Sequence, residues 1–418
     1  MSTEQLRALE SELSEQYLAI KQQGLNLDLT RGKPGNEQLD LSNALLGDIS
    51  EAARRDASLR NYGGLLGIPA ARELFAPVLG TTVDETLVGG SSSLTLMYFA
   101  AHFAMHIGVD GPGSAWNTEG KIKFLAPVPG YDRHFSVCET LGIELIPVAL
   151  LDDGPDMDEV ERLLKADPLI KGIWCVPRFS NPTGHVYSEA VVKRFAGLGK
   201  IAGKNFRIFW DNAYALHAID DNAPTLANLM DACRAEGTED SVYLFGSTSK
   251  ITFAGAGISF AGMSKRNLSN FSGNLGMTQI GPDKINQLRH VEFLKDLDTL
   301  NALMQKHAAL LKPRFDAVLK GLESGLAGTG MGEWTQPRGG YFISFNTRPG
   351  LAAEVVSMAA DAGVKLTPAG ATYPYGKDPE DRNIRIAPSV PTVADITAAT
   401  EVFVTCVKLA TVRQQLAG

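Results

Sequence analysis

Residues 241–262, SVYLFGSTSKITFAGAGISFAG, place one lysine between two apolar runs. The runs cover residues 242–245 and 258–261, and each has the length and continuous hydrophobicity of a strand buried in a parallel sheet. The turn between them contains Ser247, Thr248, Ser249 and Lys250, and a glycine-rich loop follows. A lysine at the end of a buried strand normally extends its amine to the surface, but hydroxyls and glycines around Lys250 could hold it in a cleft. Because a desolvated lysine loses its proton more easily and attacks carbonyl carbon, Lys250 is a candidate nucleophile, with a surface lysine as the alternative.

Five more apolar runs predict strands at residues 86–88, 121–126, 143–148, 172–176 and 206–210. Helical patterns, such as those at residues 157–164 and 189–201, separate several of them. This alternation predicts an α/β fold with a doubly wound, mainly parallel sheet of seven strands. Ligands of such sheets bind at the carboxyl ends of the strands. Four polar residues come directly after or at the ends of predicted strands, namely Tyr131, Asn181, Asp211 and Lys250.

A second, smaller α+β layer is expected from the two ends of the chain. Ser2 or Thr3 can cap a first helix that Gly24 ends, and the tail contains strand patterns at 341–345 and 383–387 with a helix near 353–362. A long helical pattern at 292–326, which we expect Pro313 to break, connects the two parts. We predict a large domain at 46–300 and a discontinuous small domain at 1–45 and 301–418.

Composition excludes several classes of function. The chain has 418 residues, 44% of them hydrophobic, and a formal net charge of −8, which argues against a nucleic-acid or anionic-membrane partner. No run approaches the length of a membrane span and the first residues are charged, so a cytoplasmic protein with a small-molecule substrate is expected. His102 and His106 are four residues apart, but no third ligand is evident and no metal site is expected. The cysteines are far apart and are expected to be small core residues: Cys138, Cys175, Cys233 and Cys406.

Several motifs occur in the order found in one enzyme family. Besides the Lys250 turn, they are Asn181-Pro182-Thr183-Gly184, Asp211-Asn212-Ala213-Tyr214 and Arg385. Together they resemble the fold-type I enzymes that use pyridoxal 5'-phosphate (PLP), and they span most of the chain. The segment at residues 29–35, LTRGKPG, makes the chain most similar to a divergent bacterial aspartate aminotransferase group.

The resemblance implies a role for each residue around the cofactor ring. Lys250 would hold the aldehyde as a Schiff base, and Asp211 would keep the ring nitrogen protonated so that the ring acts as an electron sink. Asn181 and Tyr214 would donate to the phenolate oxygen, and Tyr131 would stack on the ring. The alternatives are a helix cap for Asp211, a turn for Asn181 and a core position for Tyr214. His134, three residues after Tyr131, matches a histidine that supports the aspartate in some family members.

Serine hydroxyls would bind the cofactor phosphate. Ser91, Ser92 and Ser93 precede a predicted helix, whose free N–H groups make an anion site, although serines also cap helices without any ligand. The resemblance adds Ser247 and Ser249, and it places Tyr62 on the phosphate of a neighbouring subunit, with a surface-loop tyrosine as the alternative. Family members commonly carry an arginine eight residues after the lysine, where this chain has Ile258. Either another cation, such as Lys33 or Lys265, or hydroxyls and backbone amides alone would then hold the phosphate.

Arg385 matches the arginine that binds the substrate's α-carboxylate, and Gly32 matches a glycine of the loop that touches the substrate. An exposed arginine and a plain linker are the alternatives. A second cation would select a dicarboxylic substrate, and Arg31, Lys33, Arg178 and Lys284 are candidates. The resemblance therefore implies a homodimeric PLP-dependent aminotransferase, with aspartate and 2-oxoglutarate as the expected pair. A PLP lyase or decarboxylase is the alternative among enzymes, and a PLP-binding sensor domain is the alternative outside them.

Overall fold

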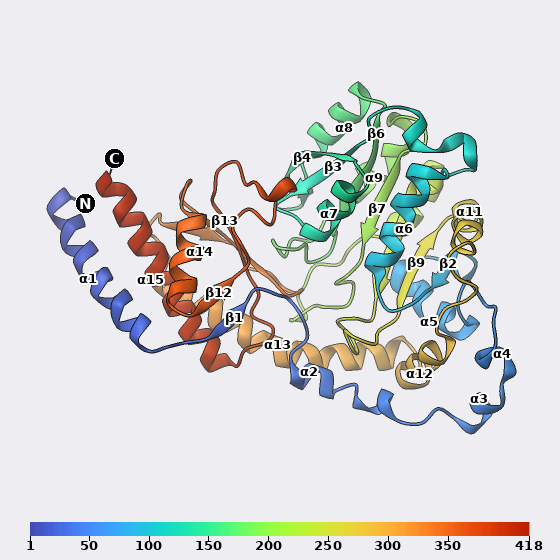
Figure 1. Cartoon of the computed structure of the whole chain (residues 1–418), viewed down its shortest axis with the longest axis horizontal. Coiled ribbons are helices and arrows are strands. Elements are labelled where there is room, and N and C mark those ends of the chain that lie inside the picture. The colour runs from blue at the N-terminus through green and yellow to red at the C-terminus, as the bar shows by residue number, and fades with distance from the viewer. Residues whose placement is uncertain (418) are drawn as a thin grey trace.

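The computed structural model describes residues 1–417, and its helices and strands alternate along most of the chain (Figure 1). The strands are β1 (Leu27–Leu29), β2 (Thr86–Val88), β3 (Lys123–Val128), β4 (Glu144–Leu151), β5 (Gly154–Pro155), β6 (Ile170–Cys175), β7 (Arg207–Asp211), β8 (Val242–Ser247), β9 (Ser259–Met263), β10 (Gly332–Trp334), β11 (Ile343–Thr347), β12 (Val364–Leu366) and β13 (Asn383–Ile386). The helices are α1 (Thr3–Gln22), α2 (Asn36–Asp40), α3 (Glu51–Arg55), α4 (Ala57–Arg60), α5 (Pro69–Leu79), α6 (Ser93–His106), α7 (Asp132–Thr140), α8 (Met157–Ala166), α9 (Glu189–Ile201), α10 (Leu229–Glu236), α11 (Lys265–Leu275), α12 (Lys284–Leu294), α13 (Leu297–Leu326), α14 (Ala352–Asp361) and α15 (Val393–Ala417).

The large sheet contains all seven expected strands and confirms the mainly parallel α/β fold. Its order is β2-β9-β8-β7-β6-β3-β4-β5, and the eighth strand, β5, is a two-residue strand antiparallel to β4 that the sequence analysis missed. The expectation that residues 258–261 form another parallel strand is wrong, because β9 runs antiparallel to both β8 and β2. The connection at residues 248–258 contains no helix, so the chain turns back instead of crossing over.

Helices cover both faces of this sheet (Figure 1). Neighbouring strand residues point to opposite sides, so Phe124 and Phe209 join one apolar core while Leu125 and Ile208 join the other. Helices α6, α7 and α11 contribute to the first core, and α5, α8, α9 and α10 to the second. Two buried cores of this kind hold the strands rigidly, which fixes the positions of residues at the strand ends.

The ends of the chain form a second layer beside the large sheet. Strands β10, β11 and β13 make an antiparallel sheet, and β1 pairs in parallel with β12. Helix α1 lies alongside α15, which places the two termini next to each other (Figure 1). The Ser2 side chain caps α1 through a capping box, and Gly24, in the left-handed conformation at φ +64°, follows its end. The predicted domain boundaries stay a prediction, although this packing joins two expected parts of the small domain.

The long connecting helix differs from its prediction. The break lies between α12 and α13, where Lys295 has φ 57° and the Asp296 side chain caps the new helix through the Thr299 N–H at 2.8 Å. Helix α13 then continues through Pro313 to Leu326, so the expected break at Pro313 is wrong. Proline removes one backbone hydrogen bond, but the buried neighbours Leu311 and Phe315 hold the helix on both sides of it.

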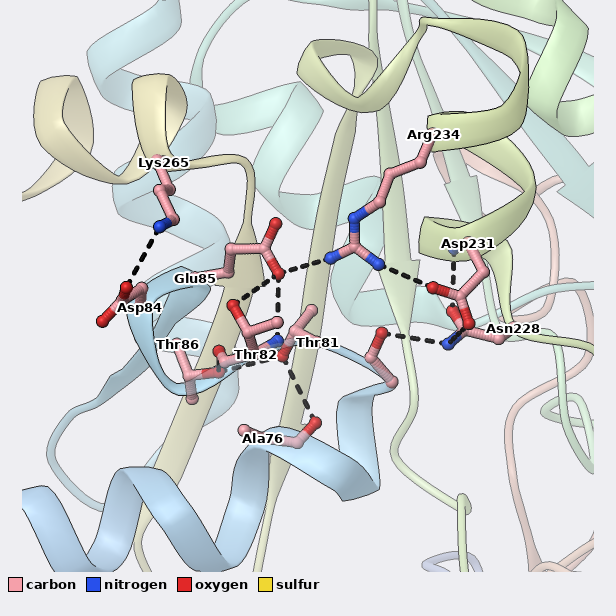
Figure 2. A network of polar contacts seen from close by, with 11 residues as sticks. Ala76, Thr81, Thr82, Asp84, Glu85, Thr86, Asn228, Asp231, Arg234 and Lys265 are labelled. Carbon is pink, nitrogen blue, oxygen red and sulfur yellow. Dashed lines mark hydrogen bonds and ion pairs between the residues drawn. The ribbon is translucent and has the colours of Figure 1, made fainter.

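A polar network joins the turn before β2 to α10 (Figure 2). Glu85 accepts hydrogen bonds from the backbone N–H and the hydroxyl of Thr82, both at 2.9 Å, and from Arg234. Burial opposes ionisation of Glu85, but these donors outweigh it and lower the pKa of the carboxyl. Lys265 pairs with the neighbouring Asp84 at 3.0 Å. The network therefore fixes the amino end of β2.

Two other expectations concern the whole chain. All four cysteines are buried and free, which confirms that they are core residues. Among the helices of residues 1–417, none combines the length and the apolar character needed to cross a bilayer.

Candidate active site

A cavity of about 650 Å³ lies at the carboxyl ends of β3, β6, β7 and β8. These four strands are neighbours in the sheet, so the residues that follow them meet at one edge. Its walls come from the loop after β1, the strand-end residues and the second layer: Thr30, Arg31, Gly32, Lys33, Tyr131, Asp132, Arg133, Asn181, Tyr214, Lys250, Phe342, Thr367, Pro368, Ala371 and Arg385. Five of the sequence-predicted ring and substrate residues thus share one cavity with Gly32.

Lys250 follows β8 in the turn before β9, and its Nζ lies 5.0 Å from the centre of the Tyr214 ring. Burial lowers the pKa of the Lys250 amine, and the negative charge of Asp211 opposes that shift without cancelling it. The amine therefore carries a larger neutral, nucleophilic fraction than a surface lysine would.

Asp211 is the last residue of β7 and is buried. Its Oδ2 lies 3.0 Å from His134 Nε2, and the His134 ring stacks on Trp174 with 4.4 Å between ring centres. Its Oδ1 is buried and has no hydrogen-bond partner among residues 1–417. His134 therefore holds Oδ2 in place, while Oδ1 remains available to a hydrogen-bond donor, such as the protonated nitrogen of a heterocycle.

Tyr131 and Tyr214 supply aromatic walls. Tyr131 precedes α7 and meets the His134 ring edge to face at 4.9 Å, and burial raises the pKa of its hydroxyl to about 12. Tyr214 is buried, and desolvation raises the pKa of its hydroxyl well above the ordinary value. Both hydroxyls therefore stay protonated at neutral pH and can act as hydrogen-bond donors.

Arg385 lies on β13 and is 7% exposed, so the alternative of an exposed edge arginine is wrong. Its Nη1 lies 3.2 Å from both Asn181 Oδ1 and Asp132 Oδ1, and its Nε donates to Thr367 Oγ1 at 3.3 Å. The guanidinium also lies over the Phe342 ring at 4.8 Å. These contacts hold the plane of the guanidinium at the cavity wall, where it can bind a carboxylate.

Gly32 explains why the loop can approach this arginine. A Cβ at this position would lie 2.4 Å from Cζ of Phe342, which is far below van der Waals contact. Only glycine lets the backbone pass this close to the ring that supports Arg385. The loop at residues 30–33 is thus part of the cavity wall and not a plain linker.

The serines proposed to bind the cofactor phosphate lie in the turn that carries Lys250 and in the loop before α6. Ser249 Oγ donates to the Ser91 carbonyl at 3.3 Å, and the Ser249 N–H lies 3.4 Å from Ser247 Oγ. Ser92 precedes α6, a helix that starts at Ser93 and has no side-chain cap. Its first N–H groups and the neighbouring hydroxyls can therefore hold an anion such as phosphate.

Three positions bear on which positive charge could bind the cofactor phosphate. Ile258 is 1% exposed and packs in the core, so position 258 offers no charge to the site. Lys265 pairs with Asp84 before β2 (Figure 2), whereas the serines follow the opposite end of that strand. Lys33 lines the cavity beside Arg385. Of the two cations named from the sequence, Lys265 is thus held away from the serines, whereas Lys33 shares the cavity with Lys250, so which groups hold the phosphate stays a prediction.

Of the four cations that could bind a second substrate carboxylate, two line the cavity and two bind backbone carbonyls. Arg31 and Lys33 line the cavity. Arg178 instead binds the backbone carbonyl of Ala215, and Lys284 binds the carbonyl of Asn61 at 2.8 Å. Lys284 thereby supports the loop that carries Tyr62, whose side chain is 82% exposed in the single chain.

Sequence reasoning missed several residues of this site. Arg133, Asp132 and Thr367 line the cavity, and Trp174 supports His134 from a buried strand. Arg133 could have been noticed because it lies between the two motif residues Tyr131 and His134. Trp174 gives no signal of its own, because an aromatic residue in an apolar strand is typical of any core.

The donor set fits PLP. A buried lysine amine, an aspartate oxygen without a partner, two protonated tyrosines and an uncapped helix start match its aldehyde, ring nitrogen, ring and phosphate. The fold and this set of residues define the class: fold-type I PLP-dependent enzymes.

Comparison with known proteins gives the family. The aspartate amino-transferase family model matches residues 1–418, and the chain belongs to that family. An aspartate aminotransferase of Corynebacterium glutamicum is 43% identical over 97% of this chain and 94% of its own length. A Mycolicibacterium smegmatis protein is 46% identical over 94% of this chain and 93% of its own.

Solved structures agree. The crystal structure of an aspartate transaminase from C. glutamicum superposes with a TM-score of 0.94 at 43% identity, covering 99% of this chain and 98% of the other. An α-aminoadipate aminotransferase from Thermus thermophilus, complexed with N-(5'-phosphopyridoxyl)-L-leucine, has a TM-score of 0.73 at 20% identity, covering 94% and 93%, and shares the fold. The protein is thus an aminotransferase with PLP as cofactor, which favours transamination over the lyase, decarboxylase and sensor alternatives.

Proposed function

We propose that this enzyme transfers the amino group of aspartate to 2-oxoglutarate. The observation that carries the proposal is a set of cations on the cavity wall: Arg31, Lys33 and Arg133 join Arg385 around one space. Within residues 1–417 the first three form no ion pair, so their charge is available to a second carboxylate. The 43% identity with an aspartate aminotransferase of C. glutamicum supports the same substrate.

In this proposal Arg385 binds the α-carboxylate of the amino acid. Its guanidinium is held by Thr367, Asn181 and the Phe342 ring, so it presents a fixed set of donors. A substrate with two carboxylates would then span from Arg385 to the cations of Arg31 or Arg133. Monocarboxylic amino acids would leave the second group of cations without a partner and bind more weakly.

PLP, when bound, supplies an electron sink that stabilises negative charge at the α-carbon of the substrate. Lys250 would hold its aldehyde, and the Lys250 amine, once displaced by the substrate amine, would accept the proton from the substrate α-carbon and deliver it to the carbon that had carried the aldehyde. The lowered pKa that burial gives this amine suits both tasks. Asp211 Oδ1 would bind the ring nitrogen, with His134 fixing the other oxygen. Asn181 and Tyr214 would contact the ring oxygen, Tyr131 would stack on the ring, and the serines at residues 91–93, 247 and 249 would bind the phosphate.

We also propose that two copies form the working enzyme. Exposed apolar side chains occupy two touching loops, where Tyr62 is 82%, Met277 86% and Ile280 62% exposed. The two loops are in close contact at Gly281 and Gly63: a Cβ added at Gly281 would lie only 2.4 Å from the carbonyl oxygen of Gly63. Such a patch favours a protein interface, and Tyr62 would reach the cofactor phosphate of the partner subunit. The cytoplasmic location stays a prediction.

The test of the substrate is a comparison of two amino donors with and without the rim cations. Aspartate and alanine are each assayed with 2-oxoglutarate in the wild type and in Arg133→Ala and Arg31→Ala. The proposal predicts that at least one variant loses about tenfold or more in kcat/KM for aspartate and little for alanine. Equal losses for both donors, or a wild type that prefers alanine, would contradict it.

A further inference from the structure

Two consecutive backbone carbonyls, those of Lys250 and Ile251, accept hydrogen bonds from buried side chains that the proposed chemistry does not use. His217 Nε2 lies 3.2 Å and Tyr341 Oη 3.4 Å from the Lys250 carbonyl oxygen. His307 Nε2 lies 2.9 Å from the carbonyl oxygen of Ile251. All three side chains are at most 3% exposed.

The direction of each hydrogen bond follows from the chemistry of the groups. A carbonyl only accepts, so both histidines carry their proton on Nε2. Burial lowers the pKa of His307, and it lowers the pKa of His217 to about 3, so both rings are neutral at neutral pH. In the neutral His307 ring Nδ1 must then be an acceptor.

Gln38 completes this network. Its Nε2 lies 3.0 Å from His307 Nδ1 and 3.0 Å from Tyr341 Oη, so its two hydrogens reach both partners. Tyr341 thus accepts a hydrogen bond from Gln38 and donates its own hydroxyl hydrogen to the Lys250 carbonyl. The Gln38 oxygen in turn accepts the Gly35 N–H at 3.1 Å. Apart from Nδ1 of His217, every donor and acceptor in this set has a consistent role.

The same network reaches the substrate loop. Gly35 lies two residues after the segment at residues 30–33 that lines the cavity, and the Ser389 hydroxyl donates to the Lys33 carbonyl at 2.7 Å. Gln38 is 1% exposed, so no water competes for its amide. Gln38, acting through Tyr341, therefore links the loop that lines the cavity to the main chain of Lys250.

We propose that Gln38, Tyr341, His307 and His217 are positioning residues that fix the main chain at Lys250 relative to the substrate loop. None of the four lines the cavity, and they act by setting where the Lys250 amine lies when it moves a proton. Four segments distant in sequence supply them, namely α2, the stretch after β7, α13 and the residues before β11. The inference rests on Lys250 as the lysine that holds PLP.

The experiment compares Tyr341→Phe and Gln38→Leu with the matched control Tyr17→Phe in the PLP-loaded enzyme. Tyr17 also donates its hydroxyl to a backbone carbonyl, that of Met358 at 2.9 Å, but it lies on α1. The readouts are kcat and KM separately, the melting temperature, and the pH midpoint of the visible absorbance change of the lysine-bound cofactor. His217→Gln, which keeps an N–H donor for the Lys250 carbonyl, is compared with His217→Leu, which does not.

The proposal predicts that Tyr341→Phe and Gln38→Leu lower kcat about five- to tenfold and move the pH midpoint by about half a unit, as expected for one lost hydrogen bond. Tyr17→Phe should lower the melting temperature alone, and His217→Gln should retain more kcat than His217→Leu. Variants that lose stability but keep the wild-type kcat and midpoint would overturn the network. A wild type without the absorbance band would instead contradict Lys250 itself, so the two failures are distinguishable.

Discussion

Replacing His217 by glutamine should change how the stability of the protein depends on pH. His217 is 3% exposed and packs edge to face against Tyr214 and Tyr341. Desolvation lowers the pKa of its ring from 6.5 to about 3, although the hydrogen bond to the Lys250 carbonyl acts in the opposite direction. The ring therefore stays neutral in the folded protein under conditions where it is protonated in the unfolded chain.

The size of the effect follows from this difference in pKa. Because the unfolded state binds a proton that the folded state does not, stability is retained above pH 6.5 and is lost as the pH falls toward about 3. Between pH 7.5 and pH 5, the unfolded chain gains about 2 kcal/mol from protonation of this one histidine. Glutamine does not titrate, so the His217→Gln variant should lose about 2 kcal/mol less than the wild type over the same interval.

Guanidinium unfolding of both proteins at the two pH values, with PLP present throughout, measures this difference. The variant's lower stability at either pH does not matter, because only the change between the two pH values is compared. His290 and His307, whose pKa values burial also lowers, titrate in both proteins and cancel. If the two proteins lost the same free energy of unfolding between pH 7.5 and pH 5, the buried neutral state of His217 would be refuted.

Three further substitutions test the proposed roles. Arg385→Lys should lower kcat/KM for aspartate about 10²- to 10³-fold in steady-state assays while PLP still binds, because lysine cannot replace the two-pronged guanidinium. A small loss would contradict the role of Arg385. Asp211→Asn should lower kcat about 10²-fold or more, since an amide cannot stabilise a protonated ring nitrogen, and wild-type kcat would refute that role. Ser249→Ala should weaken PLP binding measured by fluorescence titration, whereas Lys265→Ala should not; the reverse result would restore Lys265 as the phosphate cation.

Much of the fold could be predicted because apolar runs of strand length alternate with helical periodicity. Each of the seven predicted strands exists, and because β3, β6, β7 and β8 are adjacent and parallel in the sheet, the residues that follow them lie at one edge. The direction of β9 could not be predicted in this way, because a buried apolar run has the same pattern in either orientation. The continuity of α13 through Pro313 depends on packing on both sides of the helix, which local sequence rules do not contain.

That Asn181, Asp211, Tyr214 and Lys250 lie close together could be predicted, because each residue type is tied to a strand end and a family motif; their roles toward PLP stay predictions. The site was not predictable where a contact joins segments far apart in the chain. Gln38 and Tyr341 are 303 positions apart and yet share a hydrogen bond. Gln38 lies in a five-residue helix, where nothing in the local sequence distinguishes it from a surface glutamine.

The central claim is that Lys250 forms the covalent bond to PLP. Reduction of the purified, PLP-loaded enzyme with borohydride, followed by proteolysis and mass spectrometry, locates the lysine that carries the cofactor. The account predicts that the reduced cofactor is found on the peptide containing Lys250, and that Lys250→Ala retains none. Recovery of the cofactor on a different lysine, or its complete release from the reduced wild-type protein, would contradict the account.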